Sequence, residues 1–282
     1  MLEKKKIGES NFIVDARQLI CHACQLGRHV RLPFYPSTSY TVKPFALLHC
    51  DLWTSPVPST SGYLYYLMIV DDYTHYFWTF PLHKKSDVYA TFLTFHAYAR
   101  TQFDLPIVAI QSDNGREFDS HSVRSLLSEH GSVLRLSCPY TSQQNGKAER
   151  VLRTLNNSVR ALLLHASMPP RFWAGALNTA TYLLNRRPCH TSTPRTPHEL
   201  HLGVAPDYSV LRVFGCLCYP SIASTTPHKL APRSLNTQGY RCYDPISHRV
   251  FTSRHVYFDE RVFPFQQVPP VVSSSPSLLA TG

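Results

Sequence analysis

Apolar and polar residues alternate in short runs from residue 47 onwards, with turn-forming segments between the runs. The runs LLHCDLW, YLYYLMIVDD and YFWTFPL are rich in β-branched and aromatic residues, and the segments SPVPSTSG and DYTH interrupt them. Runs of this length and composition predict strands. The short connections between them predict that the three strands are antiparallel neighbours.

Helical and strand-like patterns alternate after the third run. Ser86–Gln102 has apolar residues at helical spacing behind a serine N-cap, and the run IVAIQS follows as a fourth strand. A second helix is predicted at Ser120–His130, and VLRLSC is the fifth strand. Three antiparallel strands followed by this alternation predict an α/β fold, with a mixed five-stranded sheet flanked by helices.

A long helix is predicted over Lys147–Ala166. Glu149 lies one turn before Leu152 and extends the apolar stripe of this helix to the rim of the sheet. The stripe has the three-four spacing of a surface that faces a core, at Leu152, Leu155, Val159 and Leu162. A further helical stretch is predicted over Phe172–Asn185.

Composition divides the chain into five segments. Cys, Pro and Ser punctuate the first, prolines crowd the third, and Pro and Ser dominate the last. Short β-type runs such as VFGCLCYP return in the fourth segment. We expect a knuckle and linker at 1–45, an α/β core at 46–188, a Pro-rich linker at 189–210, a small β module at 211–266 and a disordered tail at 267–282.

The chain is strongly basic. It has 28 Lys and Arg against 18 Asp and Glu among 282 residues, a formal charge of +10. Such an excess favours a polyanionic partner, because each neutralised phosphate releases counterions. No apolar run approaches the roughly 18 residues that cross a bilayer, and the start MLEKKKIGE does not resemble a signal peptide. We therefore expect an intracellular protein with reduced thiols and no membrane partner.

Three carboxylates lie where strand ends and the long helix would meet. They are Asp51 in the first strand, Asp113 in QSDNGREF and Glu149 in PYTSQQNGKAER. Converging carboxylates supply hard oxygen ligands for Mg²⁺ or Mn²⁺, and two such ions about 3.5–4 Å apart can support phosphoryl transfer. The competing interpretations are an Asp-Asn-Gly turn for Asp113 and a helix-dipole contact for Glu149. Asp71 and Asp72 are interpreted as turn residues.

Residues beside these carboxylates are assigned supporting roles. Asn114 and Gly115 are expected to shape the turn that aims Asp113, and Glu117 is expected to cap or pair locally. The polar loop and the first turns of the long helix provide candidate DNA contacts, with ordinary surface charge as the alternative interpretation. These candidate contacts are Gln144, Asn145, Lys147, Arg150 and Arg153.

Several long motifs in a fixed order resemble the integrase segment of a copia-type LTR retrotransposon polyprotein. They run from CHACQLGRHVRLPF through HCDLW, VDDYTHYFWTFPL, QSDNGREF and CPYTSQQNGKAERVLRTL to FGCLCYP, PHKLAPRS and SRHVYFDERVFPF. The resemblance implies a ribonuclease-H-like catalytic core of the DDE polynucleotidyl transferase type and an SH3-like C-terminal module. It implies that Asp51, Asp113 and Glu149 bind metal and support 3′-end processing and strand transfer of DNA. A homo-oligomer that acts on DNA in the nucleus is also implied.

Two departures from the family pattern affect the flanking modules. Cys21 and Cys24 remain, but the first twenty residues contain no histidine, so we expect a zinc-knuckle remnant without Zn²⁺. Only LNTQ separates PHKLAPRS from GYRCYDP, where the family has a further strand, so we expect an incomplete β module. The alternative function is a catalytically inactive nucleic-acid-binding remnant. A ribonuclease H would share the metal chemistry but not the QQNGKAER motif.

Overall fold

The computed structural model describes residues 3–7, 10–14, 41–138, 142–188, 195–220 and 239–266. Met1–Ser39 and Tyr40–Gly282 form two separate compact units. In the first unit, strands β1 (Glu3–Ile7) and β2 (Ser10–Val14) pair antiparallel, an element that the sequence analysis did not predict. The predicted zinc-knuckle remnant around Cys21 and Cys24 lies outside the described residues.

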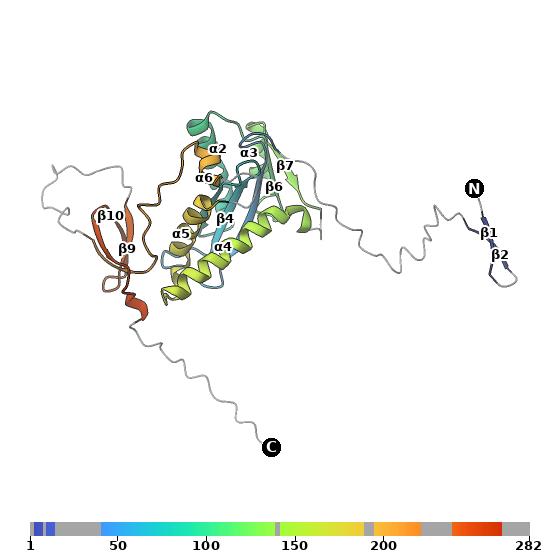
Figure 1. Ribbon diagram of the computed structural model, residues 1–282. Coiled ribbons are helices and arrows are strands. Elements are labelled where there is room, and N and C mark those ends of the chain that lie inside the picture. The colour runs from blue at the N-terminus through green and yellow to red at the C-terminus, as the bar shows by residue number, and fades with distance from the viewer. Residues whose placement is uncertain are drawn as a thin grey trace, which may run out of the picture. The chain divides into compact units, whose positions relative to one another are not determined.

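A mixed sheet of five strands forms the centre of the second unit (Figure 1). Its order is β5-β4-β3-β6-β7, in which β3, β4 and β5 are antiparallel neighbours and β6 and β7 run parallel to β3. The predicted fold class is confirmed. The strands are β3 (Leu48–Thr54), β4 (Tyr65–Asp71), β5 (Phe77–Leu82), β6 (Ala109–Ser112) and β7 (Val133–Leu136).

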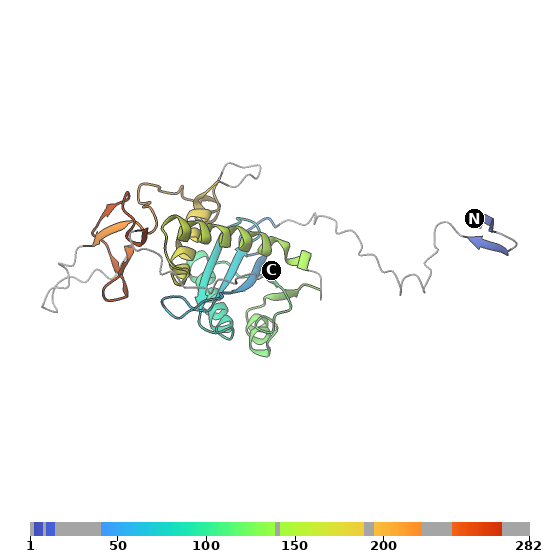
Figure 2. The ribbon, with the colours of Figure 1, turned by 90° about the horizontal axis from the view of Figure 1, so that it is seen from below.

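Helices cover both faces of this sheet. Figure 2 shows the sheet between one layer that contains α4 and α5 and an opposite layer that contains α2 and α3. The predicted N-cap Ser86 precedes α2 but makes no side-chain capping hydrogen bond, whereas the Ser120 hydroxyl caps α3 by accepting a hydrogen bond from Val123 N at 3.3 Å. The helices of this unit are α2 (Asp87–Phe103), α3 (His121–Glu129), α4 (Gly146–His165), α5 (Trp173–Arg186) and α6 (Pro197–Leu202).

Strand β4 shows why the sheet is buried on both sides. Leu67 and Ile69 belong to the apolar cluster on the α2 and α3 face, whereas Tyr66, Met68 and Val70 belong to the cluster on the α4 and α5 face. All five side chains are at most 1% exposed. Because successive side chains of a strand point to opposite faces, a continuous apolar run is what a strand between two helical layers requires.

The predicted Pro-rich linker is wrong for part of its range. Residues 197–202 form α6, and the Thr196 hydroxyl caps it by accepting a hydrogen bond from Glu199 N at 3.1 Å. His201 is 7% exposed and its ring stacks on Tyr76 at 4.7 Å between centroids. The sequence T-P-H-E is a capping box with proline at the first helical position, and this signal was missed.

Four short strands are described in the C-terminal part of the chain. β8 pairs antiparallel with β11, and β9 pairs antiparallel with β10. The stretch PHKLAPRSLNTQ, where a missing strand was expected, lies outside the described residues, as does the predicted disordered tail. The strands are β8 (Leu217–Pro220), β9 (Tyr240–Asp244), β10 (Arg249–Ser253) and β11 (Val256–Asp259). Within the described residues, no helix is both long and apolar enough to cross a membrane.

Candidate active site

The strand register brings Asp51 and Asp113 to the same level of the sheet. Leu48 of β3 lies opposite Ile110 of β6, and His49 lies opposite Gln111. The same parallel register, continued by two residues, places Asp51 level with Asp113, which follows the last residue of β6. Asp51 also pairs with Met68 of β4, whose side chain packs on the α4 face. Asp51 therefore faces α4.

The start of α4 is attached to the strand that contains Asp51. Asn145 directly precedes the helix, and its side-chain amide donates a hydrogen bond to the carbonyl oxygen of Cys50 at 3.1 Å. Gln111 of β6 donates from its side chain to the carbonyl oxygen of Gln144. These contacts fix the first turn of α4, and Glu149 within it, beside the ends of β3 and β6.

The pKa of Asp51 depends on the charges of the other two predicted carboxylates. Burial is the main cause that raises the pKa of Asp51 to about 6, and the negative charge of Asp113 is the next. The Leu52 N–H lowers the pKa of Asp51, while Glu149 and Glu117 add smaller increases. We call Asp51, Asp113 and Glu149 the carboxylate cluster. A carboxylate whose acidic neighbours oppose its ionisation favours a bound cation.

The carboxylate cluster keeps oxygen atoms free for ligation. Asp51 accepts one hydrogen bond from Leu52 N at 2.8 Å, and Asp113 accepts one from Gly115 N at 3.1 Å. Among the described residues Glu149 makes no ion pair. No three His, Cys, Asp or Glu side chains within the described ranges already surround a point where a metal ion could be held. The donor chemistry fits Mg²⁺ or Mn²⁺, but the side chains must move inward to bind it.

The turn after β6 aims Asp113, as predicted. Asn114 donates from its side chain to the carbonyl oxygen of Ser137 at 2.6 Å and so ties the turn to the end of β7. A Cβ atom at Gly115 would lie 2.9 Å from the Glu117 side chain and 3.1 Å from an Asp113 carboxylate oxygen. Glycine therefore allows both acidic side chains to approach the backbone. Glu117 pairs with Lys85 at 3.2 Å, so its partner is 32 positions away rather than local in the sequence.

A second acidic group, which we call the Asp72 network, lies beyond the end of β4. The Asp72 carboxylate accepts hydrogen bonds from His49 Nε2 at 2.9 Å, Lys147 Nζ at 2.7 Å and Thr41 Oγ1 at 2.9 Å. Burial alone would raise the pKa of Asp72, but these donors lower it well below its ordinary value. Neighbouring Asp71 is fully buried and bonds the turn residue Thr74. Both residues have structural partners, in agreement with the turn interpretation.

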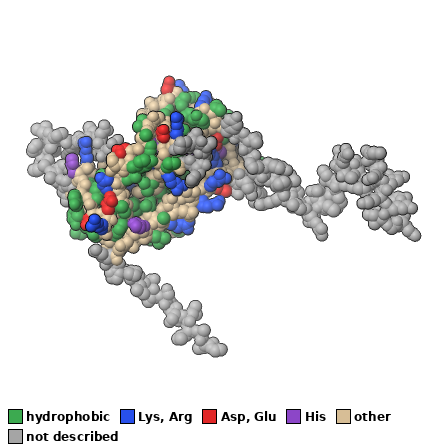
Figure 3. Space-filling view, viewed as in Figure 1, with side chains coloured by type: hydrophobic (Ala, Val, Ile, Leu, Met, Phe, Trp, Pro, Cys, Tyr) green, Lys and Arg blue, Asp and Glu red, His purple; other side chains and the backbone are tan. Residues whose placement is uncertain are grey.

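The predicted DNA contacts fall into two groups. Asn145 is 2% exposed, Lys147 is paired with Asp72, and Gln144 accepts a hydrogen bond from Cys138 N at 2.6 Å. Arg150 and Arg153 are exposed, and neither makes an ion pair within the described ranges. Figure 3 shows Lys and Arg side chains over the face along which α4 runs. The two arginines are thus the members of the predicted set that are free to meet phosphate.

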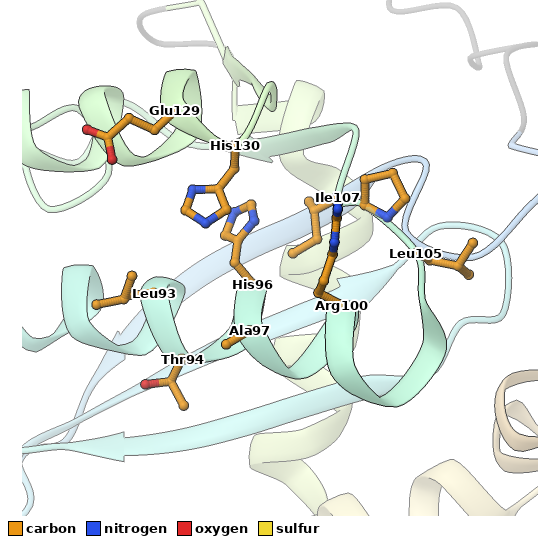
Figure 4. A pocket seen from close by; sticks show the side chains of 10 residues that line it. Leu93, Thr94, His96, Ala97, Arg100, Leu105, Ile107, Glu129 and His130 are labelled. Carbon is orange, nitrogen blue, oxygen red and sulfur yellow. The ribbon is translucent and has the colours of Figure 1, made fainter.

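A hollow of about 690 Å³ lies away from the carboxylate cluster, between α2 and α3 (Figure 4). Its lining includes His96, His130 and Arg100 but no member of the carboxylate cluster. The two imidazole rings lie 4.7 Å apart between centroids. Burial, together with the positive charge of His130, lowers the pKa of His96 to about 4. This hollow is therefore separate from the candidate active site.

Comparison with known proteins gives two family matches and several relatives. Residues 41–142 match the integrase core domain, and residues 216–271 match the retroviral polymerase SH3-like domain. The chain is 38% identical over 266 residues to the retrovirus-related Pol polyprotein from transposon RE2 of Arabidopsis thaliana, covering 91% of this chain and 18% of that protein. It is 31% identical over 250 residues to the Pol polyprotein from transposon TNT 1-94 of Nicotiana tabacum, covering 85% and 19%.

A solved structure supports the fold. The chain resembles a protein of the simian T-cell lymphotropic virus intasome, determined in complex with PP2A regulatory subunit B56 gamma, with a TM-score of 0.51 and 17% identity over 68% of each chain. The chain spans about a fifth of the length of the curated relatives that it matches.

Proposed function

The chain contains an integrase core domain and a retroviral polymerase SH3-like domain and is related to copia-type Pol polyproteins, and on this basis we propose that it joins DNA strands with the help of divalent metal ions. The reactions would be 3′-end processing of the element's DNA and strand transfer into target DNA. The observation that carries this proposal is the β3–β6 register, which places Asp51 level with Asp113 while Asn145 attaches the start of α4 to β3. Such a site is suited to a cation.

Each member of the carboxylate cluster would bind metal from a different element. Asp51 would do so from β3, Asp113 from the turn after β6, and Glu149 from α4. Bound Mg²⁺ or Mn²⁺ supplies an activated oxygen nucleophile and stabilises the charge on the reacting phosphate. The protein contributes position, because the β3–β6 register keeps two carboxylates level and the bond from Asn145 to Cys50 holds α4 beside them. Phosphoryl transfer depends chiefly on such positioning.

DNA is the proposed partner, as both element ends and target. Arg150 and Arg153 are exposed in the first turns of α4, beside the carboxylate cluster, and the net charge is +10. Arginine binds phosphate through its planar fork of donors, so these two residues would hold the backbone near the reacting bond. We also propose action as a homo-oligomer in the nucleus, where chromosomal DNA lies.

The test is strand transfer on duplex DNA that carries element ends, with Mg²⁺ present and the full chain as enzyme. Wild type should yield shortened 3′ ends and joined products, and Asp113→Asn should yield neither while keeping its affinity for DNA. Equal product from the two proteins would contradict metal catalysis by the carboxylate cluster. Robust cleavage of an RNA–DNA hybrid without DNA joining would instead indicate a ribonuclease H.

One observation favours a second candidate, a catalytically inactive DNA-binding remnant. In the part of the chain that the structure describes, the carboxylate cluster does not already form a metal-holding set. If its side chains cannot close on a cation, only the basic surface would remain functional. Binding of DNA that weakens with salt, with no product in either Mg²⁺ or Mn²⁺, would support this candidate.

A further inference from the structure

The start of α4 is held by contacts to two strands and to the residue that follows a third. The side chain of Asn145 reaches β3, and β6 reaches the loop through Gln111. The third contact is made by Lys147, whose ammonium group donates to the carbonyl oxygen of Asp72 at 2.6 Å and to its carboxylate at 2.7 Å. Asp72 follows β4 directly. Helix ends fray unless their groups are attached, so these contacts decide where the turn lies.

Lys147 differs from an unpaired surface residue that would be available to contact DNA. Its side chain is 26% exposed and that of Asp72 is 16% exposed. Asp72 is itself fixed by His49 at 2.9 Å and by Thr41 at 2.9 Å. His49 lies two residues before Asp51, and Lys147 lies two residues before Glu149. The Asp72 network therefore links the segments that carry two members of the carboxylate cluster.

We propose that Lys147 is a positioning residue that sets Glu149 against Asp51, rather than a phosphate contact. This inference rests on the proposed metal-dependent function. Residues two apart on a helix do not face each other, so Lys147 can hold the end of β4 while Glu149 turns toward β3. Loss of the contact leaves Glu149 on a looser turn and weakens the binding of a cation that needs all three carboxylates.

The two roles of Lys147 predict opposite changes in metal affinity. Removing a positive charge beside a cation site strengthens cation binding if charge alone matters. Removing a positioning contact weakens it, and loss of an outer partner of a metal ligand typically costs about tenfold or more in affinity. The sign of the change therefore separates positioning from a purely electrostatic effect.

The experiment compares three variants of the full chain. Mn²⁺ binding is titrated by the electron paramagnetic resonance signal of the free ion, and DNA binding is measured across a salt series. Lys147→Met should weaken Mn²⁺ binding roughly tenfold and leave the salt slope of DNA binding unchanged. Lys147→Arg keeps the charge and the donors and should restore most of the affinity. The matched control Arg150→Met should lower the salt slope by about 0.9, and its Mn²⁺ binding should be equal to that of wild type or tighter, but not weaker.

Two results of the binding measurements would overturn the proposal. One is unchanged or tighter Mn²⁺ binding by Lys147→Met, and the other is a fall in its salt slope equal to that of Arg150→Met. Amide hydrogen exchange in residues 146–150 tests the contact without metal, and Lys147→Met should accelerate it severalfold. If wild type binds no Mn²⁺ but the exchange still accelerates, the proposed function fails and the attachment of α4 stands. Unchanged exchange would show that Lys147 does not hold the turn.

Discussion

Asp51 and Asp72 belong to neighbouring strand segments of one sheet, yet their surroundings are opposite. Asp72 receives hydrogen bonds from His49, Lys147 and Thr41, and these donors hold its pKa well below the ordinary value. Asp51 receives one backbone hydrogen bond and is near other carboxylates, and its pKa rises to about 6. In the folded protein, hydrogen-bond donors balance the negative charge of Asp72. The negative charges of the carboxylate cluster are not balanced in this way.

The difference separates a structural acid from a functional one. An ionised carboxylate that is half-buried near like charges raises the free energy of the folded state. An ionised Asp51 at the meeting point of β3, β6 and α4 therefore lowers the stability of the folded protein. A divalent cation would remove the repulsion and convert the same arrangement into a binding site. The predictions below test this contrast, beginning with the largest expected effect.

Asp72→Ala should destabilise the fold most. The change leaves the His49 ring without its acceptor and the partly buried Lys147 ammonium with only the carbonyl oxygen of residue 72, and breaking a buried ion pair on one side costs about 3 kcal/mol. Urea unfolding monitored by circular dichroism measures the loss. Asp119→Ala is the matched control, since it removes the more exposed pair with Arg124 and should cost under about 1 kcal/mol. Equal losses in both variants would refute the structural role of the Asp72 network.

Asp51→Asn should have the opposite sign and raise the stability of the metal-free protein. The amide keeps the acceptor for Leu52 N but carries no charge. The shift of the Asp51 pKa from 3.8 to about 6 corresponds, after a discount for partial exposure, to about 1–2 kcal/mol at pH 7.5. Catalysis should be lost in the same variant.

The pH dependence provides an internal control for this variant. The folded-state pKa of Asp51 is raised, so ionisation of Asp51 costs no stability below about pH 3.8. The folded protein loses this stability as the pH rises through about 6. The stability difference between Asp51→Asn and wild type should therefore grow from pH 4 to pH 7.5. A constant difference across this range would show that the charge of Asp51 is not its cause.

Mg²⁺ should narrow the stability difference between the two proteins. A cation that binds the folded state alone stabilises it by about 1.4 kcal/mol at roughly ten times its Kd. Wild type should gain this stability in differential scanning calorimetry, and Asp51→Asn should gain much less because one ligand is neutral. An identical shift in both proteins would place the Mg²⁺ site elsewhere.

The sequence predicts the carboxylate cluster, but it does not predict the Asp72 network. The order of strands and helices along the chain predicts a mixed sheet flanked by helices, and the motifs around Asp113 and Glu149 predict the carboxylate cluster. These features are local patterns with a fixed period or spacing. The partner of Lys147 is not predictable in this way, because Asp72 lies 75 positions away and a lysine beside a catalytic motif suggests phosphate contact.

Burial explains the other differences. Asn145 belongs to a polar loop and was expected to face DNA, yet its amide is inside the protein and bonded to Cys50. His201 lies in a proline-rich stretch and was expected in a linker, yet its ring is buried and stacks on the ring of Tyr76. Composition describes what a segment prefers on average, and a tertiary contact can reverse that preference for a single side chain.

The smallest expected effects test whether the carboxylate cluster is one electrostatic unit. The charges of Asp113, Glu149 and Glu117 raise the pKa of Asp51 in decreasing order. The neutral variants Asp113→Asn, Glu149→Gln and Glu117→Gln should therefore lower the pKa of Asp51 in that order, as measured by carbon-13 NMR of its carboxyl group without metal. Asp104→Asn, at the far end of α2, is the control and should leave the titration unchanged. If Glu149→Gln has no more effect than this control, Glu149 lies too far from Asp51 to share a cation, and the three-carboxylate site is refuted.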